Sequence, residues 1–341
     1  MATSAQARSL TAEELAQAYY VAQTRQQRIT ADRVQALWRE LDRRDLSGSW
    51  ESLVGPEIVR TVTLGQAAAA SGADAYVAAV AEAEGGSSDA AGRVRVSAFS
   101  GRAADGRSLD LLLYLPVITT KEAISAGLDD VEAMMRGLHQ LLRMAASEVA
   151  DAGRGATGAS IAANRTINGY IRVVNPPACA RCLILAGKEF GWNAGFQRHP
   201  KCDCVHLPAV LIKRGGRHPR AFDVKSYFHG LSGAEQDRLF TAAGARAIRD
   251  GASITSVVNA RRGMYTADAY RRRLSATREG ATRRGSFYRS ERALAISRGR
   301  VPLSGAGFHL VSPRLLPEEI YRLAGSRDEA IAMLRRFGYI A

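Results

Sequence analysis

The chain lacks the features that mark disulfide-rich secreted proteins and membrane-spanning proteins. It contains only 4 cysteines in 341 residues. No run of eighteen apolar residues occurs. The nearest stretch, residues 65–85, is rich in alanine but is broken by glycine, aspartate and glutamate. The composition therefore predicts a globular protein and no membrane contact.

Sequence signatures of common enzymes are missing as well. The chain has no P-loop and no glycine-rich dinucleotide loop after a strand, and none of its 6 histidines lies in an HExxH motif or beside a nucleophile elbow. The paired acids Glu318 and Glu319 open a helix, where carboxylates suit the helix dipole. We therefore predict a protein that is not an enzyme.

What the chain does have is a cluster of all its cysteines within 26 positions, 179–204. A CxxC turn supplies two thiolates to an ion of the zinc type, and an overlapping HxxC and CxC knuckle can supply two more. Because four ligands complete a tetrahedron, more candidates exist than places. The predicted ligands of a structural Zn²⁺ are Cys179 and Cys182 with two of His199, Cys202 and Cys204, and His206 is the weakest further candidate.

Two disulfides or four plain thiols are the alternatives to a metal. The N-terminal residues MATSAQARSLTAEELAQ show no apolar signal-peptide core, so we expect synthesis in a reducing cytosol, where disulfides are rare. Plain buried thiols would have no reason to cluster in this way. A site this rich in thiolate is usually closed to water, so the spacing favours a structural ion over a catalytic one.

Positive charge is concentrated at one end of the sequence. Residues 1–206 carry 22 basic and 22 acidic side chains, whereas residues 207–341 carry 25 and 11, so the whole net charge of +14 lies after the cysteines. Residues 261–300 alone hold 12 arginines and 3 acids. Such a segment attracts polyanions through phosphate contacts. The predicted nucleic-acid contacts are Arg261, Arg262, Arg271, Arg272, Arg273, Arg283 and Arg284.

Helical periodicity dominates the first half of the chain. Capping-box patterns open helices at Thr11 with Glu14, at Thr119 with Glu122 and at Ser232 with Glu235. Residues 129–150 show an apolar stripe that includes Val131, Met135 and Leu141, and YIRVV before the cysteines predicts a strand. Residues 232–262 allow a helix, turn and helix, a weak sign of a DNA-reading unit. Residues 263–312 are predicted to be irregular.

The fold class predicted from these patterns is mainly α. We expect a helical assembly domain over residues 1–150, because its balanced charge and amphipathic helices favour protein partners. A small α+β zinc-knuckle segment should follow over 151–210, and an Arg-rich, partly irregular region with short helices over 211–341.

Beyond these physical patterns, the sequence resembles a known family. CARCLILAGKEF, HPKCDC and the following LP, from residue 179 to residue 208, are similar to the cysteine signature of the MuF-like minor head (head-morphogenesis) proteins of tailed bacteriophages. The stretches YFHGLSGAEQDRLFTAAGARAIRDGASITSVVNARRGM, TREGATRRG, LPEEIYRLAG and LRRFGYI resemble versions from phages of actinobacteria. The resemblance covers residues 160–340. The chain departs from the family at Asp203, where arginine is usual.

The resemblance implies a minor capsid protein that is assembled in the host cytoplasm and lies in the capsid interior of the virion. Its implied partners are the portal protein, the major capsid protein and packaged double-stranded DNA, and its implied role is to assist head assembly and DNA packaging or ejection. An enzyme is the alternative, either a capsid maturation protease or a zinc-dependent nuclease. In addition, the arginines could dock on an acidic protein surface in place of DNA.

Overall fold

The computed structural model describes residues 10–195, 204–210 and 222–340, and every structural statement below refers to these ranges. The chain is 59% helix and 10% strand, so the predicted mainly α class is confirmed. It divides into two compact units. The first contains Met1–Pro176 and Ala186–Phe222, and the second contains Pro177–Leu185 and Asp223–Ala341. The domain boundaries predicted at residues 150 and 210 stay predictions, although one helix runs without a break across residue 150.

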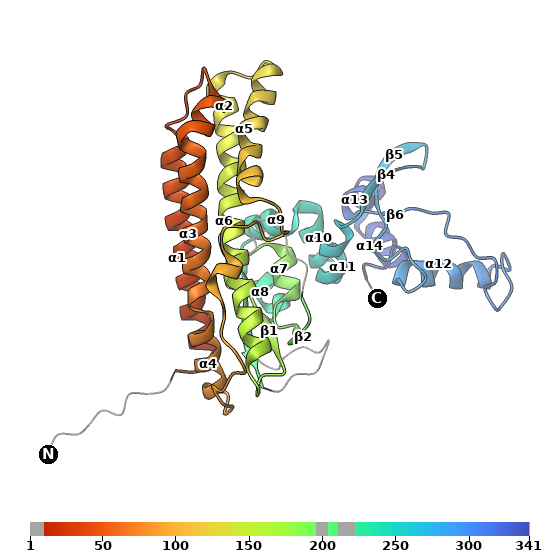
Figure 1. Ribbon diagram of the computed structural model, residues 1–341. Helices are drawn as coiled ribbons and strands as arrows, with labels where there is room; N and C mark the ends of the chain where they lie inside the picture. The colour runs from red at the N-terminus through yellow and green to blue at the C-terminus, as the bar shows by residue number, and fades with distance from the viewer. Residues whose placement is uncertain (1–9, 196–203, 211–221, 341) are drawn as a thin grey trace. The chain divides into compact units, whose positions relative to one another are not determined.

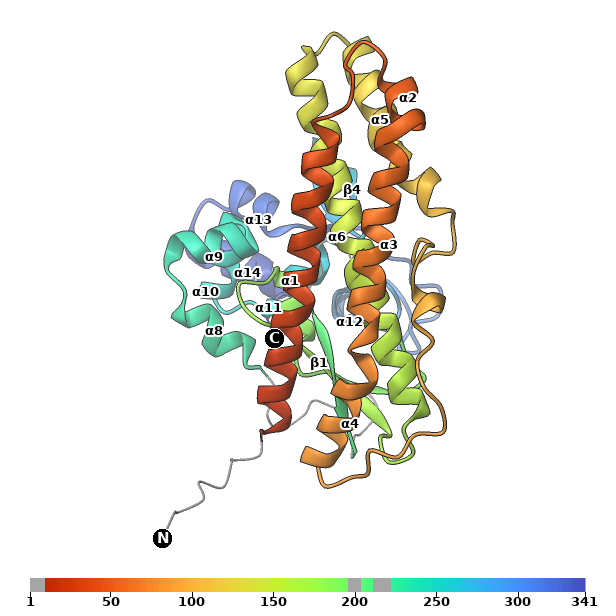
Figure 2. The ribbon, with the colours of Figure 1, turned by 60° about the vertical axis from the view of Figure 1, so that its left-hand side comes forward.

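The first unit is a bundle of long helices with a small sheet. Its helices are α1 (Ala12–Trp38), α2 (Leu46–Ser49), α3 (Gly55–Ser71), α4 (Ala73–Ala83), α5 (Leu109–Ser125) and α6 (Asp130–Ala163), with a π-helical turn at Trp50–Val54 and a 3-10 turn at Val96–Phe99. Figures 1 and 2 both show α1, α3 and α6 side by side.

Local sequence signals start two of these helices. At α1 the Thr11 hydroxyl accepts the N–H of Glu14, and the Glu14 carboxylate accepts the N–H of Thr11, so the predicted capping box is confirmed. At α6 the Asp129 carboxylate accepts two backbone N–H groups of the first turn. The capping box predicted at Thr119 is wrong, because Thr119 lies inside α5, which begins ten residues earlier at Leu109.

The core of the bundle forms around α6, which contacts α1, α3 and α5. The buried positions of α6 recur every four residues at Ala133, Gly137, Leu141, Ala145 and Val149. Three of these five residues are alanine or glycine, so the neighbouring helices approach closely. This buried face differs from the predicted apolar stripe at the beginning of α6.

Two residues of that predicted stripe, Val131 and Met135, are exposed in the structure. Their exposed fractions are 55% and 50%. The buried face at this end of α6 is instead formed by Ala133 and Gly137, the small residues between and after them.

The sheet of the first unit covers one end of the bundle. Strands β1 (Gly169–Val173), β2 (Glu189–Gly191) and β3 (Val205–Ala209) pair antiparallel in the order β2-β1-β3, and β1 confirms the predicted strand. Tyr170 and Leu207 of the sheet share an apolar cluster with Tyr76 of α4 and Ala16 of α1. Burial of this shared face fixes the sheet on the helices.

The second unit contains shorter elements. Its helices are α7 (Ala180–Leu185), α8 (Val224–Gly230), α9 (Gly233–Phe240), α10 (Ala242–Arg249), α11 (Ile254–Ala260), α12 (Ser286–Ser297), α13 (Pro317–Leu323) and α14 (Arg327–Arg336). Its antiparallel sheet has the order β4-β5-β6, formed by β4 (Met264–Ala269), β5 (Arg272–Thr277) and β6 (Arg314–Leu315). The capping box predicted at Ser232 opens α9 and is confirmed.

Residues 263–312 are more ordered than the sequence indicates. The prediction of an irregular segment is wrong for the hairpin β4–β5 and for α12, and it holds for much of the stretch after α12. The physical reason is that β4 has little apolar alternation and the hairpin turn has no glycine or asparagine. Both of the usual sequence signals of a hairpin are therefore missing.

Glycines of α6 provide a test of the close packing. A Cβ at Gly137 would lie 2.0 Å from the Thr120 hydroxyl, 2.8 Å from the Trp38 ring and 2.9 Å from a backbone carbonyl, whereas a Cβ at Gly158 would meet nothing within 4 Å. We expect Gly137→Ala to lower the free energy of unfolding by about 1–3 kcal/mol. Gly158→Ala in the same helix should raise it by about 0.5–1 kcal/mol, because alanine favours the helix.

Urea unfolding followed by circular dichroism measures both changes. Equal effects of the two substitutions would show that the packing at Gly137 is loose.

Candidate functional site

The CxxC turn of the predicted metal site lies in the second unit. Cys179 is exposed and directly precedes α7, in which Cys182 is buried. The backbone N–H of Cys182 donates to the Cys179 sulfur at 3.5 Å. Because an N–H donor favours the thiolate, which is the form that binds metal, the turn has the chemistry of half a metal site.

The other half of the predicted ligand set is only partly described. His199 and Cys202 lie outside the described residues. Cys204 is buried just before β3 in the first unit, and its carbonyl accepts a hydrogen bond from Arg154 at 3.3 Å. Within residues 10–195, 204–210 and 222–340, no three histidine, cysteine or acidic side chains gather as metal ligands do. The zinc ligands therefore remain a prediction.

His206, the weakest ligand candidate, has a structural place in the first unit. Its ring lies 4.2 Å from the ring of Tyr170, and its carbonyl accepts the hydroxyl of Tyr76 at 2.8 Å. These contacts tie the strand β3 to α4 and β1.

The seven arginines predicted to bind nucleic acid divide into two groups. Arg261 pairs with the carboxylate of Glu318 and donates to the hydroxyl of Thr241 at 2.9 Å. Arg262 lies 3.8 Å from the carboxylate of Glu279. Because these two guanidinium groups already have acidic neighbours in the fold, they contribute less to an anion-binding surface than the sequence predicts.

The other five arginines of the prediction are exposed. None of them forms an ion pair with an acidic residue of the described chain. Three lie at the end of the hairpin β4–β5, and two lie in the loop between β5 and α12. They are Arg271, Arg272, Arg273, Arg283 and Arg284.

A second group of basic residues, outside the seven predicted arginines, lies together in the fold. A groove of about 350 Å³ at the end of α12 is lined by Arg298, Arg300, His309 and Arg336, together with apolar side chains such as Phe308. Arg336 also pairs with Glu291 at 3.2 Å. Arg298 and Arg300 belong to the Arg-rich segment. Arg336 is the last residue of the final helix, α14, and no local pattern could have placed it there.

One arginine of the second unit is buried, and its guanidinium is hydrogen-bonded within the fold. Arg314 is 3% exposed, and its guanidinium donates to the carbonyls of Phe337 (2.7 Å), Glu279 (2.8 Å) and Gly338 (3.2 Å). Burial lowers its pKa. It also lies 4.2 Å from the ring centroid of Tyr339, whose pKa burial raises to about 12.

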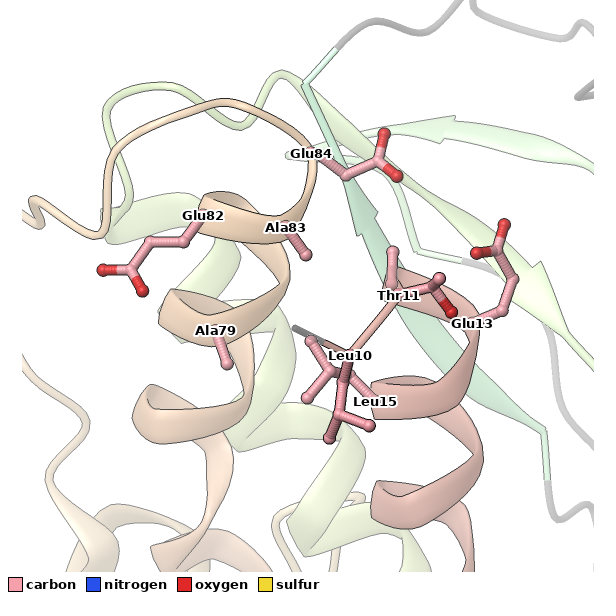
Figure 3. A pocket seen from close by; sticks show the side chains of 9 residues that line it. Leu10, Thr11, Glu13, Leu15, Ala79, Glu82, Ala83 and Glu84 are labelled. Carbon is pink, nitrogen blue, oxygen red and sulfur yellow. The ribbon is translucent and has the colours of Figure 1, made fainter. Parts of the chain in front are cut away.

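The first unit has a groove whose charged lining residues are acidic, in contrast to the basic groove beside α12. It has a volume of about 920 Å³ and lies between the start of α1 and the end of α4 (Figure 3). Leu10 and Leu15 face Ala79 and Ala83 across it. Its charged lining residues are Glu13, Glu82 and Glu84. Carboxylates repel phosphate, so this groove does not belong to a nucleic-acid surface.

Comparison of the chain with protein-family models, with curated proteins and with solved structures finds no significant match. In the part of the chain that the structure describes, no helix has both the length and the apolar character needed to cross a bilayer. The functional interpretation therefore rests on the residues themselves.

The predicted metal is tested on the purified full-length chain. If the cysteine cluster holds a structural ion, we expect one equivalent of zinc per chain by atomic emission. Cys179→Ala should release that zinc and lower the melting temperature, because the binding energy of a structural ion contributes to folding. His309→Ala, which replaces an exposed histidine outside the cluster, should leave the metal content unchanged. A wild-type chain without zinc would show that the cysteines are thiols or disulfides.

Proposed function

We propose that this chain is a non-enzymatic minor head protein of a tailed bacteriophage, of the MuF-like kind that its sequence resembles. In this proposal the protein is assembled in the host cytoplasm and lies inside the capsid of the virion. It contacts the portal protein and the major capsid protein, and it binds packaged double-stranded DNA without sequence preference. Its role is to assist head assembly and DNA packaging or ejection.

The observation that carries the DNA contact is the exposure of five arginines, three at the tip of the hairpin and two in the loop that follows the base of β5. No ion pair within 4 Å joins any of the five to an acidic side chain of the described residues, although Asp268 lies across the hairpin from Arg273, so most of their charge is available to an external anion. A phosphate backbone is the most abundant anion that a packaged genome offers, and arginine binds phosphate through two parallel N–H groups. Phosphate contacts carry no sequence information, which fits a protein that must bind any part of a genome.

The division of charge between the units supports the same arrangement. The second unit contains the Arg-rich segment, whereas the groove of the first unit is lined by carboxylates. Like charges repel, so DNA is attracted to the second unit and not to the acidic groove.

Exposed apolar side chains on the bundle support protein partners for the first unit. They occur in pairs. Three of the pairs each lie within one helix, and in the fourth Leu53 of the π-helical turn precedes Leu64 of α3. The pairs are Val21 with Ile29, Leu53 with Leu64, Leu111 with Ile118 and Val131 with Met135. Exposed apolar side chains mark protein contacts where they form a contiguous patch. We propose that these faces meet the portal and capsid proteins.

The zinc ion belongs to the proposal as a structural element. Cys179 and Cys182, with two of Cys202, Cys204 and His199, would hold it as a closed tetrahedral site in the small α+β segment 151–210. Such an ion supplies folding energy and needs no water ligand. A donor set of four thiolates, or of three thiolates and one imidazole, suits zinc better than magnesium or calcium, which prefer oxygen ligands.

The DNA contact predicts a steep dependence of affinity on salt. If five arginines each neutralise one phosphate, the plot of log affinity against log salt concentration should have a slope of about −4 to −5. In the full-length chain, Arg283→Ala with Arg284→Ala should make the slope less negative by about 2. Fluorescence anisotropy with two unrelated duplexes, between about 50 and 200 mM salt, measures this slope.

The matched control is Arg43→Ala with Arg44→Ala, an exposed adjacent pair in the first unit that removes the same charge. It should leave the slope unchanged. Absence of binding at low salt would overturn the DNA contact and favour docking of the arginines on an acidic protein. Cleavage of the duplex during the titration would instead support the zinc-dependent nuclease.

Placement in the virion is tested by cross-linking and mass spectrometry of purified particles. We expect cross-links from the first unit to the portal or capsid protein. Leu53→Gln with Leu64→Gln should reduce incorporation into particles, because the loss of two apolar anchors costs an interface about 2 kcal/mol or more. Ser52→Gln, at an exposed neighbouring position, should not. Normal incorporation of the double variant would exclude this face from the contact.

A further inference from the structure

The hairpin β4–β5 ends in a turn with an unusual composition. The strands pair from Met264 with Thr277 to Ala269 with Arg272, which leaves only Tyr270 and Arg271 in the turn. Both turn residues have positive φ, at 50° and 59°. This is the geometry of a two-residue type I′ turn, for which Asn-Gly is the preferred sequence.

Neither turn residue is explained by packing within the second unit. A left-handed conformation costs an ordinary residue about 1–2 kcal/mol. Tyr270 is nevertheless 52% exposed, Arg271 is exposed, and no hydrogen bond or ion pair joins either side chain to another described residue. The fold thus holds an aromatic ring and a guanidinium in a strained position, facing solvent. Strain of this kind points to a use outside the fold.

The arginines next to the turn lie on both faces of the hairpin. Successive residues of a strand point to opposite sides, so Arg272 shares a face with the buried Leu274, and Arg273 lies on the other face, across from Asp268. Arg271 lies at the end. Guanidinium groups therefore lie at the end and on both faces of the tip, and Asp268 offsets part of the charge on the face of Arg273.

The tip is also slim and stands clear of the core. Residues Tyr270–Arg273 are all exposed, and burial begins only at Leu274. The strand β4 contributes the small side chains of Ala267 and Ala269 opposite Leu274 and Arg272. In Figure 1 the turn points away from α13 and α14.

A groove of duplex DNA matches this shape and charge better than a flat acidic surface does. A flat surface would meet one face of the hairpin and leave an arginine of the other face unused, whereas a groove has phosphates along both walls. Paired strands lie about 4.8 Å apart, and the major groove, about 12 Å wide, admits a two-stranded ribbon. The minor groove of undistorted B-DNA is only about 6 Å wide, so a ribbon enters it only where the duplex is bent or widened.

We propose that the tip of the β4–β5 hairpin inserts into the major groove of duplex DNA, with Arg272 and Arg273 toward the phosphates of the two walls and with Tyr270 and Arg271 deepest in the groove. This inference rests on the proposed DNA contact and adds the part of the duplex that is bound.

The decisive variant replaces the turn by its preferred sequence, Tyr270→Asn with Arg271→Gly, in the full-length chain. Because Asn-Gly suits the turn, the melting temperature should stay the same or rise, which shows that the fold is kept. Affinity for a duplex should fall by about tenfold or more, since the groove contacts are lost. Affinity for a single strand of equal length, which has no groove, should change by less than about threefold.

The charge-matched control is Arg284→Gly, which removes one exposed arginine from the loop before α12. It should weaken duplex and single-strand binding alike, by less than about threefold. If the turn variant loses no more duplex affinity than this control, the insertion of the hairpin is overturned while the DNA contact stands. If the wild-type chain binds no DNA, both proposals fail.

Competition with groove ligands gives a second, independent measurement on the wild-type chain. Methyl green, which occupies the major groove, should displace the protein from the duplex, and distamycin, which occupies the minor groove, should not. Displacement by distamycin alone would overturn the proposed groove.

Discussion

The buried guanidinium of Arg314 binds three backbone carbonyls from separate parts of the second unit, and the arrangement of that unit depends on it. The carbonyl of Glu279 follows the hairpin β4–β5, while those of Phe337 and Gly338 follow α14. Arg314 itself lies in β6, which pairs with β5. One side chain thus joins the base of the hairpin to the end of the chain. Its removal would leave buried acceptors without donors, at a cost of about 1–3 kcal/mol each. The exposed tip of the hairpin keeps its direction because its base is held in this way.

Arginine therefore plays two opposite roles in the second unit, and the surroundings decide which. At position 314 the planar group is enclosed by carbonyls and an aromatic ring, and at Arg261 it faces Glu318. At the tip of the hairpin and before α12, no ion pair within 4 Å joins an arginine of the predicted set to an acidic residue of the described chain, and only Arg273 has an acidic residue, Asp268, across the strand. The first unit is different in kind. Its long helices pack through small residues of α6, and its charged groove is acidic. Such a division suits a protein that binds other proteins with one unit and a polyanion with the other.

Much of the helical structure could be predicted from local signals. The capping boxes at Thr11 and Ser232 form as predicted, because a cap depends on residues only three positions apart. The box at Thr119 fails because the apolar residues before it extend α5 backward, and packing of that helix overrides the cap. The hairpin β4–β5 could not be predicted. Its turn lacks Asn-Gly, and its second strand, β5, pairs with β6, some forty residues later in the chain. Arg336, in the groove beside α12, was missed for the same reason.

The sequence by itself determined the mainly helical class, the position of the positive charge after residue 206, and the spacing of the cysteines. These properties follow from composition and from contacts over a few residues. Only the tertiary structure decided which arginines face solvent, that Arg314 is buried, that Arg261 has an acidic partner, and that Tyr270 and Arg271 stand together at a hairpin tip. Burial and ion pairing depend on groups that the fold brings from distant parts of the chain. The sequence of an Arg-rich segment therefore does not show which arginines are buried or paired and which face solvent.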